Sequence, residues 1–378
     1  MLTPKMSLNL EGVTWHAFFI EDIAKIISGR DIYDAERFDG KIPYISSTAK
    51  NNGVGHFVGN HNSTLESNCL SVNRNGSVGY SFFHPYKGLY SNDCRKLRPV
   101  VSSVYTPFFL SNQISLQRHK YSYGYKMGTG RLERQKIMLP ANHRDEPDWQ
   151  LMESYTQTLM DRKKVKYLNF CRKELANLRL QNIAKIEDKE WQEFFIGGKE
   201  GVFTISSTSS GIDKNKLNTG DDNEIEKTTP YITRTNEQNG INLFIPQSQQ
   251  EKFKRNAGGV ITIGLDTQTI FYQPYGFFTG QNIQILHHKS LNKWNSLFLI
   301  PLLKIQMEKF NWGGNGATLG RLRRTKVMLP TKENGSPDFE YMGQYMMNLE
   351  HRKRNQYIYH IQRSNEYTLK LTIQNKLS

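Results

Sequence analysis

Side chains that can hydrogen-bond to nucleic acid gather in three short segments of the first half of the chain. Lys and Arg bind phosphate oxygens, while Asn, Ser, Thr and Tyr carry donors and acceptors that can match base edges. The candidate contacts are Ser46, Ser47, Thr48, Lys50, Asn51 and Asn52, then Arg74, Asn75 and Ser77, then Lys120, Tyr121, Ser122, Tyr123, Lys126 and Arg131. This combination predicts a nucleic-acid surface, although Asn-Gly and Ser-Thr clusters are also typical of plain turns.

The second half of the chain contains a counterpart of each segment. The candidate contacts there are Thr233, Arg234, Thr235, Asn236, Gln238 and Asn239, then Thr267 and Gln268, then Asn311, Trp312, Asn315 and Arg321. The two sets agree in position but differ in residue type, most clearly where Arg74-Asn75 is answered by Leu265-Asp266. One scaffold with two different contact surfaces is what the recognition of two unlike half-sites requires.

One pattern could indicate a nuclease. Pro147-Asp148 followed by Asp161-Arg162-Lys163 imitates the PD-(D/E)xK arrangement, in which carboxylates hold Mg²⁺ and a lysine assists the attacking water. The second copy has Glu-His-Arg at 350–352, without the lysine, and both sets fall on expected helices. A stand-alone nuclease is therefore the less favoured alternative.

Other signatures of catalysis are missing from the sequence. It has no phosphate-binding GxxxxGK[ST] loop, no GxGxxG fingerprint after a strand, no Asn-Pro-Pro-aromatic methyltransferase motif and no HExxH spacing. We therefore expect no catalytic residues and no metal ligands in this chain.

The charge balance points to a polyanionic partner. The chain has 378 residues with 50 Lys and Arg against 35 Asp and Glu, a formal net charge of +15. The basic residues are mixed with Tyr, Asn, Gln and Ser inside segments that should fold, and do not form a basic tail. Nucleic acid is the first expectation, and a general nucleic-acid-binding protein stays open as an alternative.

An internal repeat is the most informative feature of the chain. Trp-x-x-Phe-Phe-Ile occurs at 15–20 and 191–196, and Pro-Tyr-Ile at 43–45 and 230–232. The longest match, Gly-Arg-Leu-x-Arg-x-Lys-x-Met-Leu-Pro, occurs at 130–140 and 320–330. Because the order of all the matching blocks is preserved, we infer a duplicated structural unit.

The first part of each copy has the pattern of a β-rich domain. Short β-type runs alternate with Gly, Asn and Pro, which mark turns. The expected strands are Ile42–Ile45, Cys69–Val72, Val78–Phe83, Ile114–Leu116 and Ile137–Leu139, with counterparts at Tyr231–Thr233, Val260–Ile263, Thr269–Tyr272, Ile283–Leu286 and Val327–Leu329.

The second part of each copy predicts a long helix, roughly over 149–183 and 339–376. Asp148 and Asp338 suit a helix N-terminus, and apolar residues follow at spacings of three and four. Each helix could pack on its own domain, but each is too long for one small domain to cover. We favour an antiparallel pairing of the two helices.

The remaining composition indicates a cytoplasmic protein. The three cysteines, Cys69, Cys94 and Cys171, are scattered and have no CxxC spacing, which argues against disulfides and zinc. No apolar run approaches the roughly 20 residues of a membrane span, and the first residues lack the apolar core of a signal peptide. We expect no membrane association.

These motifs together resemble one known family. Ile-Pro-Tyr-Ile-Ser at 42–46, Arg-Asn-Gly-Ser-Val-Gly at 74–79, Lys-Tyr-Ser-Tyr-Gly at 120–124 and the repeated Arg-Leu…Met-Leu-Pro block are similar to motifs of DNA specificity subunits. Such subunits belong to Type I restriction–modification systems and to the related BcgI-like (Type IIB) systems.

The resemblance implies an α+β fold with two pseudo-twofold-related, β-rich target-recognition domains joined by an antiparallel pair of long helices. We expect the domains at 1–146 and 187–336 and the helices at 147–186 and 337–378. It further implies that each domain binds one half of a split double-stranded DNA site. A partner methyltransferase, or a fused methyltransferase/nuclease, would supply catalysis with its own S-adenosylmethionine and Mg²⁺, so this chain would be non-catalytic and hold no cofactor.

Overall fold

The computed structural model describes residues 10–122, 124–208, 211–217, 228–246, 250–310 and 316–377, with side chains up to Arg363. The chain divides into two compact units, Met1–Asn169 and Phe170–Ser378. Each unit contains one copy of the repeat, and each is described by itself below.

Unit 1 is built on β-sheet, in which every described pairing is antiparallel except the parallel pairing of β3 with β7. A four-stranded sheet has the order β2-β8-β5-β6, formed by Ala24–Ser28, Cys94–Pro99, Cys69–Asn73 and Ser81–His84. A three-stranded sheet has the order β4-β3-β7, formed by Val54–Val58, Asp39–Ile45 and Leu89–Tyr90. A separate pair joins β1 (Trp15–Phe19) to β9 (Lys136–Pro140).

Unit 2 repeats this topology strand for strand. Its four-stranded sheet has the order β11-β17-β14-β15, formed by Thr204–Ser207, Ile283–His287, Val260–Gly264 and Ile270–Gln273. Its three-stranded sheet has the order β13-β12-β16, formed by Ile241–Ile245, Thr229–Ile232 and Phe278–Thr279. The pair of β10 (Trp191–Phe195) and β18 (Lys326–Pro330) keeps even the register, because Trp191 lies opposite Pro330 as Trp15 lies opposite Pro140. The duplicated structural unit is thereby confirmed.

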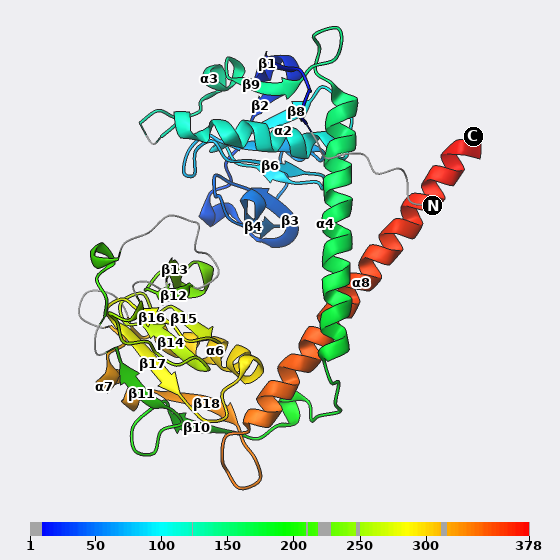
Figure 1. Ribbon diagram of the computed structural model, residues 1–378. Helices are drawn as coiled ribbons and strands as arrows, with labels where there is room; N and C mark the ends of the chain where they lie inside the picture. The colour runs from blue at the N-terminus through cyan, green and yellow to red at the C-terminus, as the bar shows by residue number, and fades with distance from the viewer. Residues whose placement is uncertain are drawn as a thin grey trace. The chain divides into compact units, whose positions relative to one another are not determined.

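Three of the described helices correspond between the units, α2 with α6, α3 with α7 and α4 with α8, and α1 has no counterpart helix among the described residues of unit 2. Unit 1 has α1 (Ile20–Ile23), α2 (Thr106–Ser115), α3 (Thr129–Glu133) and the start of α4 (Trp149–Asn177). Unit 2 has α6 (Lys293–Met307), α7 (Leu319–Arg324) and α8 (Phe339–Leu377). Figure 1 shows α4 and α8 as long single helices, against the short elements of the sheets. The chain is therefore a mixed α+β protein.

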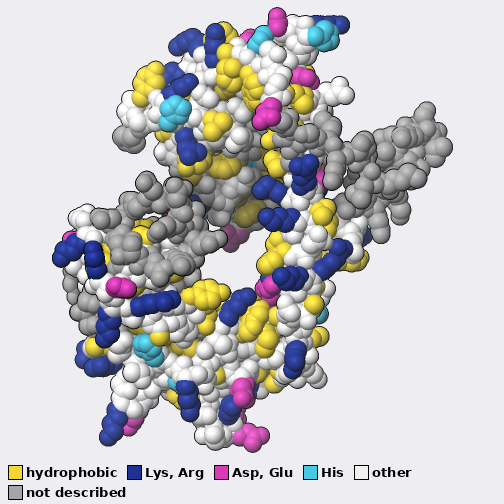
Figure 2. All heavy atoms as spheres, in the orientation of Figure 1, with side chains coloured by type: hydrophobic (Ala, Val, Ile, Leu, Met, Phe, Trp, Pro, Cys, Tyr) yellow, Lys and Arg dark blue, Asp and Glu magenta, His cyan; other side chains and the backbone are white. Residues whose placement is uncertain are grey.

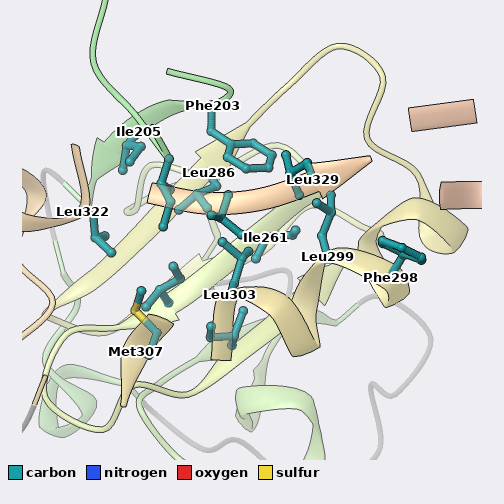
Figure 3. Close-up of a cluster of buried hydrophobic side chains, with 14 of the residues drawn as sticks. Phe203, Ile205, Ile261, Leu286, Phe298, Leu299, Leu303, Met307, Leu322 and Leu329 are labelled. Atoms are coloured by element: carbon teal, nitrogen blue, oxygen red, sulfur yellow. The ribbon is translucent and has the colours of Figure 1, made fainter. Parts of the chain in front are cut away.

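Each core lies between the four-stranded sheet and the helix that covers it. In unit 1, α2 contributes Leu110 and Ile114 to a cluster with Leu70 and Leu97 of the sheet. In unit 2, α6 contributes Leu299 and Leu303, which point toward Ile261 and Leu286 (Figure 3). Burying an apolar side chain of this size stabilises the folded state by about 1.5–3 kcal/mol relative to leaving it in water. These clusters therefore hold the sheets and helices together.

Both long helices begin at the residues that the sequence predicts. The Leu151 N–H donates to the Asp148 carboxylate at 2.9 Å, and the Tyr341 N–H donates to Asp338 at 3.0 Å. These carboxylates satisfy amide hydrogens that a helix leaves free at its start. The first turns of each helix then pack on their own unit, with Met152 and Met342 fully buried.

The end of α4 belongs to unit 2, where it lies against α8. The guanidinium of Arg354 contacts the Cys171 sulfur at 3.7 Å and lies over the Phe170 ring. Farther along, Gln344 donates to the Arg179 carbonyl at 2.7 Å, and Tyr341 donates to the Ala184 carbonyl. As the residue numbers rise from 171 to 184, those of their partners on α8 fall from 354 to 341, so the two segments run antiparallel. Each long helix begins on its own unit, and within unit 2 the α4 residues Phe170 and Cys171 contact Arg354 of α8.

Two of the expected strands are wrong or displaced. Ile114–Leu116 is not a strand, because Ile114 lies in α2, which has Pro107 in its first turn and buries Phe109, Leu110 and Ile114 on one face. The true counterpart of Ile283–Leu286 is β8. Its sequence, Cys-Arg-Lys-Leu-Arg-Pro, contains three cations, so it lacks the pattern of apolar residues by which a buried strand is recognised. The strand expected at Val78–Phe83 begins only at Ser81, because residues 78–80 belong to the turn before it.

Candidate nucleic-acid interface

The first segment of each copy folds into the same unusual turn. Asn51, Asn52 and Gly53 have φ angles of 49°, 55° and 77°, and Gln238, Asn239 and Gly240 have 46°, 59° and 79°. Asn and Gly tolerate this left-handed conformation better than other residues. The Asn52 amide donates to the Phe83 carbonyl at 3.3 Å, and the Asn239 amide donates to Tyr272 at 3.0 Å. The turn is a conserved piece of scaffold between the copies, even though its residues differ.

In unit 1 the first two segments meet at one end of the four-stranded sheet. The Ser77 N–H donates to the Ser47 carbonyl at 3.1 Å, and the buried Asn73 amide donates to the Thr48 carbonyl at 3.1 Å. The third segment approaches through Arg118, whose guanidinium lies 5.0 Å from the centre of the Tyr80 ring. We call the residues 46–52, 73–79 and 116–131 together loop end 1.

The third segment of loop end 1 is held by aromatic and backbone contacts. The Tyr121 and Tyr125 rings stack at 5.8 Å, and the guanidinium of Arg131 lies 4.0 Å from the centre of the Tyr125 ring. Arg131 also donates to the Lys126 carbonyl at 2.8 Å. These contacts keep basic and aromatic side chains in place at the surface, as a nucleic-acid contact requires.

The predicted contacts of unit 1 differ in exposure. The exposed ones are Lys50, Asn51, Asn52, Lys120, Ser122 and Arg131. The partly buried ones are Ser46, Ser47, Thr48, Arg74, Asn75, Ser77, Tyr121 and Lys126. The printed contacts join the first two segments directly and the third through Arg118 beside Tyr80; Tyr123 lies outside the described residues.

Unit 2 assembles an equivalent surface from residues 233–239, 264–269 and 316–321, which we call loop end 2. The Thr267 hydroxyl donates to the Arg234 carbonyl at 2.9 Å, and Arg321 donates to the Gly316 carbonyl at 2.9 Å, as Arg131 does in unit 1. The exposed predicted contacts are Asn236, Gln238, Asn239 and Thr267, and the partly buried ones are Thr233, Arg234, Thr235, Gln268 and Arg321. Asn311, Trp312 and Asn315 lie outside the described residues.

The two loop ends differ in how their charges are partnered. On loop end 2, Arg234 forms an ion pair with Asp266, which sits in the turn between β14 and β15. On loop end 1, the matching turn carries Arg74, and no described carboxylate forms an ion pair with it. A polyanion therefore meets a more available positive charge on loop end 1.

Sequence reasoning missed two basic residues at loop end 1: Arg118, which belongs to it, and Arg95, which is buried beside it. Arg118 lies in the 3-10 turn Leu116–Lys120, and its Cα leaves no room for a Cβ at Gly79, which has a φ of +80°. Arg95 is on β8 and only 5% exposed, with Arg74 nearby. Burial first, and the Arg74 charge next, lower the pKa of the Arg95 guanidinium. The only available signal for Arg95 was three cations in one strand.

The residues of the nuclease-like pattern do not form a site. Asp148 precedes α4 and accepts the Leu151 N–H, whereas Asp161 and Lys163 lie about 20 Å farther along the helix axis, at ~1.5 Å per residue. Carboxylates this far apart on one helix cannot hold the same metal ion. Figure 2 shows Lys and Arg side chains along α4, where Lys163 belongs to an exposed basic stretch.

The described residues offer neither a metal site nor a membrane span. No group of three or more His, Cys, Asp or Glu side chains is placed to hold a metal ion. No helix in the described part of the chain is long and apolar enough to cross a membrane.

A separate polar cluster in unit 1 is structural. Glu66 bonds the buried Lys96 ammonium and the Arg98 guanidinium, each at 2.6 Å. The bond from Arg98 is the largest cause that lowers the pKa of Glu66 to about 2, and Lys96 adds to it against the effect of burial. Nearby, burial lowers the pKa of His84 to about 4, so its ring is neutral at pH 7 and hydrogen-bonds Ser71.

Comparison with known proteins gives a consistent result. The family model described as the Type I restriction modification DNA specificity domain matches residues 12–167 and again residues 188–358. The two matches coincide with the two copies of the repeat.

A curated relative and a solved structure are similar to the chain. The specificity subunit S.BcgI of a Type II restriction enzyme from Heyndrickxia coagulans is 36% identical over 149 residues, which are 39% of this chain and 44% of the relative. The match thus spans less than half the length of that relative. The fold is similar to the S subunit of a Type I restriction–modification system from M. genitalium, with 15% identity, a TM-score of 0.50, and coverage of 96% of this chain and 95% of that one.

Proposed function

Because the chain belongs to the Type I restriction–modification DNA specificity family and is a specificity subunit, we propose that it binds a bipartite, asymmetric site on double-stranded DNA. Loop end 1 contacts one half-site and loop end 2 contacts the other. This function requires no catalytic residue in the chain itself.

The observation that carries this proposal is the duplicated topology with unlike loop ends. The strand orders and the β1–β9 and β10–β18 registers are the same in both units. The turns that follow β5 and β14 differ in length and charge, since Arg74-Asn75-Gly76-Ser77 stands against Leu265-Asp266-Thr267. A common frame with different polar surfaces suits two half-sites of different sequence.

The physical mechanism divides affinity from sequence discrimination. Contacts from Lys and Arg to phosphates supply most of the affinity and make it strongly dependent on salt. The polar side chains of the loop ends then distinguish bases, at about 1–3 kcal/mol for each good bidentate contact. The exposed Lys50 and Asn51 and the exposed Asn236 and Gln238 are the leading candidates for these contacts, because the Asn52 and Asn239 amides already donate to backbone carbonyls.

Catalysis belongs to a partner in this proposal. A methyltransferase subunit, alone or fused to a nuclease, brings S-adenosylmethionine and Mg²⁺ and acts on DNA positioned by this chain, in the cytoplasm. The long helices offer it a surface, because Val165 on α4 and Tyr359 on α8 are 54% and 63% exposed. Large apolar side chains in water commonly mark such contacts. Val165→Glu or Tyr359→Glu should weaken co-purification of the methyltransferase and leave DNA binding by the chain unchanged.

A selection experiment tests the DNA-binding proposal. The purified full chain, with and without the methyltransferase encoded beside it, is incubated with random duplexes, and the bound molecules are sequenced over several rounds. We expect two different short motifs separated by a spacer of fixed length. Enrichment of a single uninterrupted motif, of single-stranded RNA, or of no motif at all would contradict the proposal. Cleavage of plasmid by the chain alone with Mg²⁺, lost in Lys163→Ala, would instead support the nuclease alternative.

A further inference from the structure

Two arginines lie close together at loop end 1: Arg74 belongs to it, and Arg95 lies beside it on β8. Arg95 is 95% buried near the start of β8, where its Nε donates to the Thr129 hydroxyl at 2.7 Å and its Nη1 donates to the Asn92 carbonyl at 2.9 Å. Arg74 begins the turn after β5, and its backbone N–H donates to the Asp93 carbonyl at 2.9 Å, one residue before Cys94 and two before Arg95. The turn and the strand thus bring the backbones of the two residues together, and the Arg74 charge acts on the Arg95 guanidinium.

The carboxylate nearest in sequence is already engaged. Asp93 accepts a hydrogen bond from the Asn75 amide, and none of the ion pairs among the described residues includes Arg74 or Arg95. The Asp93 carboxylate acts on Arg95 from nearby, but one carboxylate offsets only one of the two guanidinium charges, and the repulsion from Arg74 outweighs its effect on Arg95. The folded unit therefore contains a charge arrangement that an external anion would stabilise.

The geometry points to a DNA phosphate as that anion: we propose that Arg74 and Arg95 together clamp one phosphate beside the half-site bound by unit 1. The clamp rests on the proposed function, and it adds a positioning site to it. A guanidinium presents forked donors that match phosphate oxygens. Because the Nε and Nη1 of Arg95 already donate to Thr129 and Asn92, Arg74 supplies the forked contact to the phosphate, and Arg95 adds only the donors that these two bonds leave. Its role is to set position, not sequence.

Unit 2 has no such clamp among its described residues. Gln284 occupies the place of Arg95, since Ile263 lies opposite Gln284 as Val72 lies opposite Arg95. Leu265 occupies the place of Arg74, because its N–H donates to the Asn282 carbonyl as that of Arg74 donates to Asp93. The clamp is therefore expected at one half-site only.

The test replaces each arginine by the residue that unit 2 carries. Arg95→Gln, Arg74→Leu and the double variant of the full chain are titrated with the selected duplex by fluorescence anisotropy between 50 and 300 mM salt. The slope of log K against log salt should fall by about 0.9 in the double variant, the contribution of one phosphate. Affinity at the lowest salt should fall about tenfold, with the selected motif unchanged. Lys25→Gln, an exposed cation on β2 of the same sheet, is the matched control and should leave the slope unchanged.

Methylphosphonate DNA locates the contact. Each phosphate near the first half-site is made neutral in turn, and one position should weaken the wild-type chain as much as the double variant is weakened on normal DNA. The double variant should be insensitive at that position. Slopes that fall by about 0.9 for each arginine separately, a changed base preference, or an unchanged slope would overturn the clamp. If the wild-type chain selects no motif, the proposed function itself fails, and the two failures are thereby distinguished.

The folded state is checked in the same samples. Replacing one of two repelling cations should leave the melting temperature equal or higher. A fall in melting temperature with weaker binding at both half-sites would show that Arg95 is only structural. Arg95→Lys, which keeps the charge without the fork, should recover part of the salt slope.

Discussion

Loop ends 1 and 2 are built on the same backbone frame and differ in how their charge is used. Asn51–Gly53 and Gln238–Gly240 repeat the same three left-handed residues, and Arg131 and Arg321 make the same carbonyl contact. On this frame, unit 1 places Arg74 beside Arg95, whereas unit 2 pairs Arg234 with Asp266. Backbone hydrogen bonds and buried apolar residues therefore maintain the same scaffold in both units. The exposed residues of the turns can differ without disturbing it, and with them the specificity can change.

The largest effect is expected from exchanging a whole domain, which tests whether each unit recognises its half-site independently. Replacing residues 1–145 by the equivalent domain of another family member should change the first half-site completely and leave the second unchanged, because each loop end lies within its own unit. The measurement is sequencing of methylated DNA in cells that also express the methyltransferase. Exchange of residues 187–336 is the reciprocal control. A change in both half-sites after either exchange would show that the units do not recognise DNA independently.

Matched core substitutions test whether the two frames are equivalent. Leu139 on β9 and Leu329 on β18 are both fully buried at the same register position. Leu139→Ala and Leu329→Ala should each lower the free energy of unfolding by about 2–5 kcal/mol, since each leaves a cavity. Urea unfolding followed by hydrogen exchange reports each unit separately.

The neighbouring exposed residues supply the controls for this pair. Met138→Ala and Met328→Ala should each change the free energy of unfolding by less than about 0.5 kcal/mol, because these side chains are 44% and 41% exposed. If one of the two Leu→Ala substitutions lowered the free energy of unfolding several times more than the other, the cores of the two units would be packed differently.

An acid-dependent difference between the units should follow from Glu66. Its pKa is lowered to about 2 from 4.5, so its contribution to stability is present above pH 4.5 and is lost as the pH falls toward 2. Unit 2 has Ile285 where unit 1 has Lys96, opposite Thr262 and Ser71 respectively. Glu66→Gln should lower the free energy of unfolding of unit 1 by about 2 kcal/mol at pH 7, because it leaves the Lys96 charge buried and unpaired while Glu66 itself is partly exposed.

The pH series is measured by urea unfolding between pH 2.5 and 7. The gap between wild type and Glu66→Gln should close toward the acid end, and Glu21→Gln, an exposed carboxylate on α1, should change stability by less than about 0.5 kcal/mol. A gap that stays constant over this range would show that Glu66 does not act through its charge.

The smallest expected effect concerns the left-handed turns. Asn52→Ala and Asn239→Ala should each lower the free energy of unfolding by about 1–2 kcal/mol, because alanine is strained at φ angles of 55° and 59°. Asn52→Gly and Asn239→Gly should cost less, since glycine loses only the hydrogen bond to Phe83 or Tyr272. Equal costs for alanine and glycine would indicate that the side-chain bond, not the backbone conformation, holds the turn.

Much of the fold was predictable from local pattern. The helix starts after Asp148 and Asp338 follow from capping chemistry, and strands such as Cys69–Asn73 and Val260–Gly264 follow from runs of apolar, β-prone residues. The pattern failed at Ile114, where a β-branched residue belongs to a helix that the sheet below it stabilises. It also failed at β8, where cations hide a buried strand.

The order of residues alone establishes the duplication, the basic character and the family, because these are written in repeated motifs and in net charge. It cannot say which polar groups meet: the Ser77–Ser47 bond, the Arg74–Arg95 approach and the Arg234–Asp266 pair join residues far apart in the chain. Those encounters depend on which strands lie side by side and in what register. Burial and electrostatic partnership are properties of that packing, so only the folded chain decides which of its many arginines remain available to an anion.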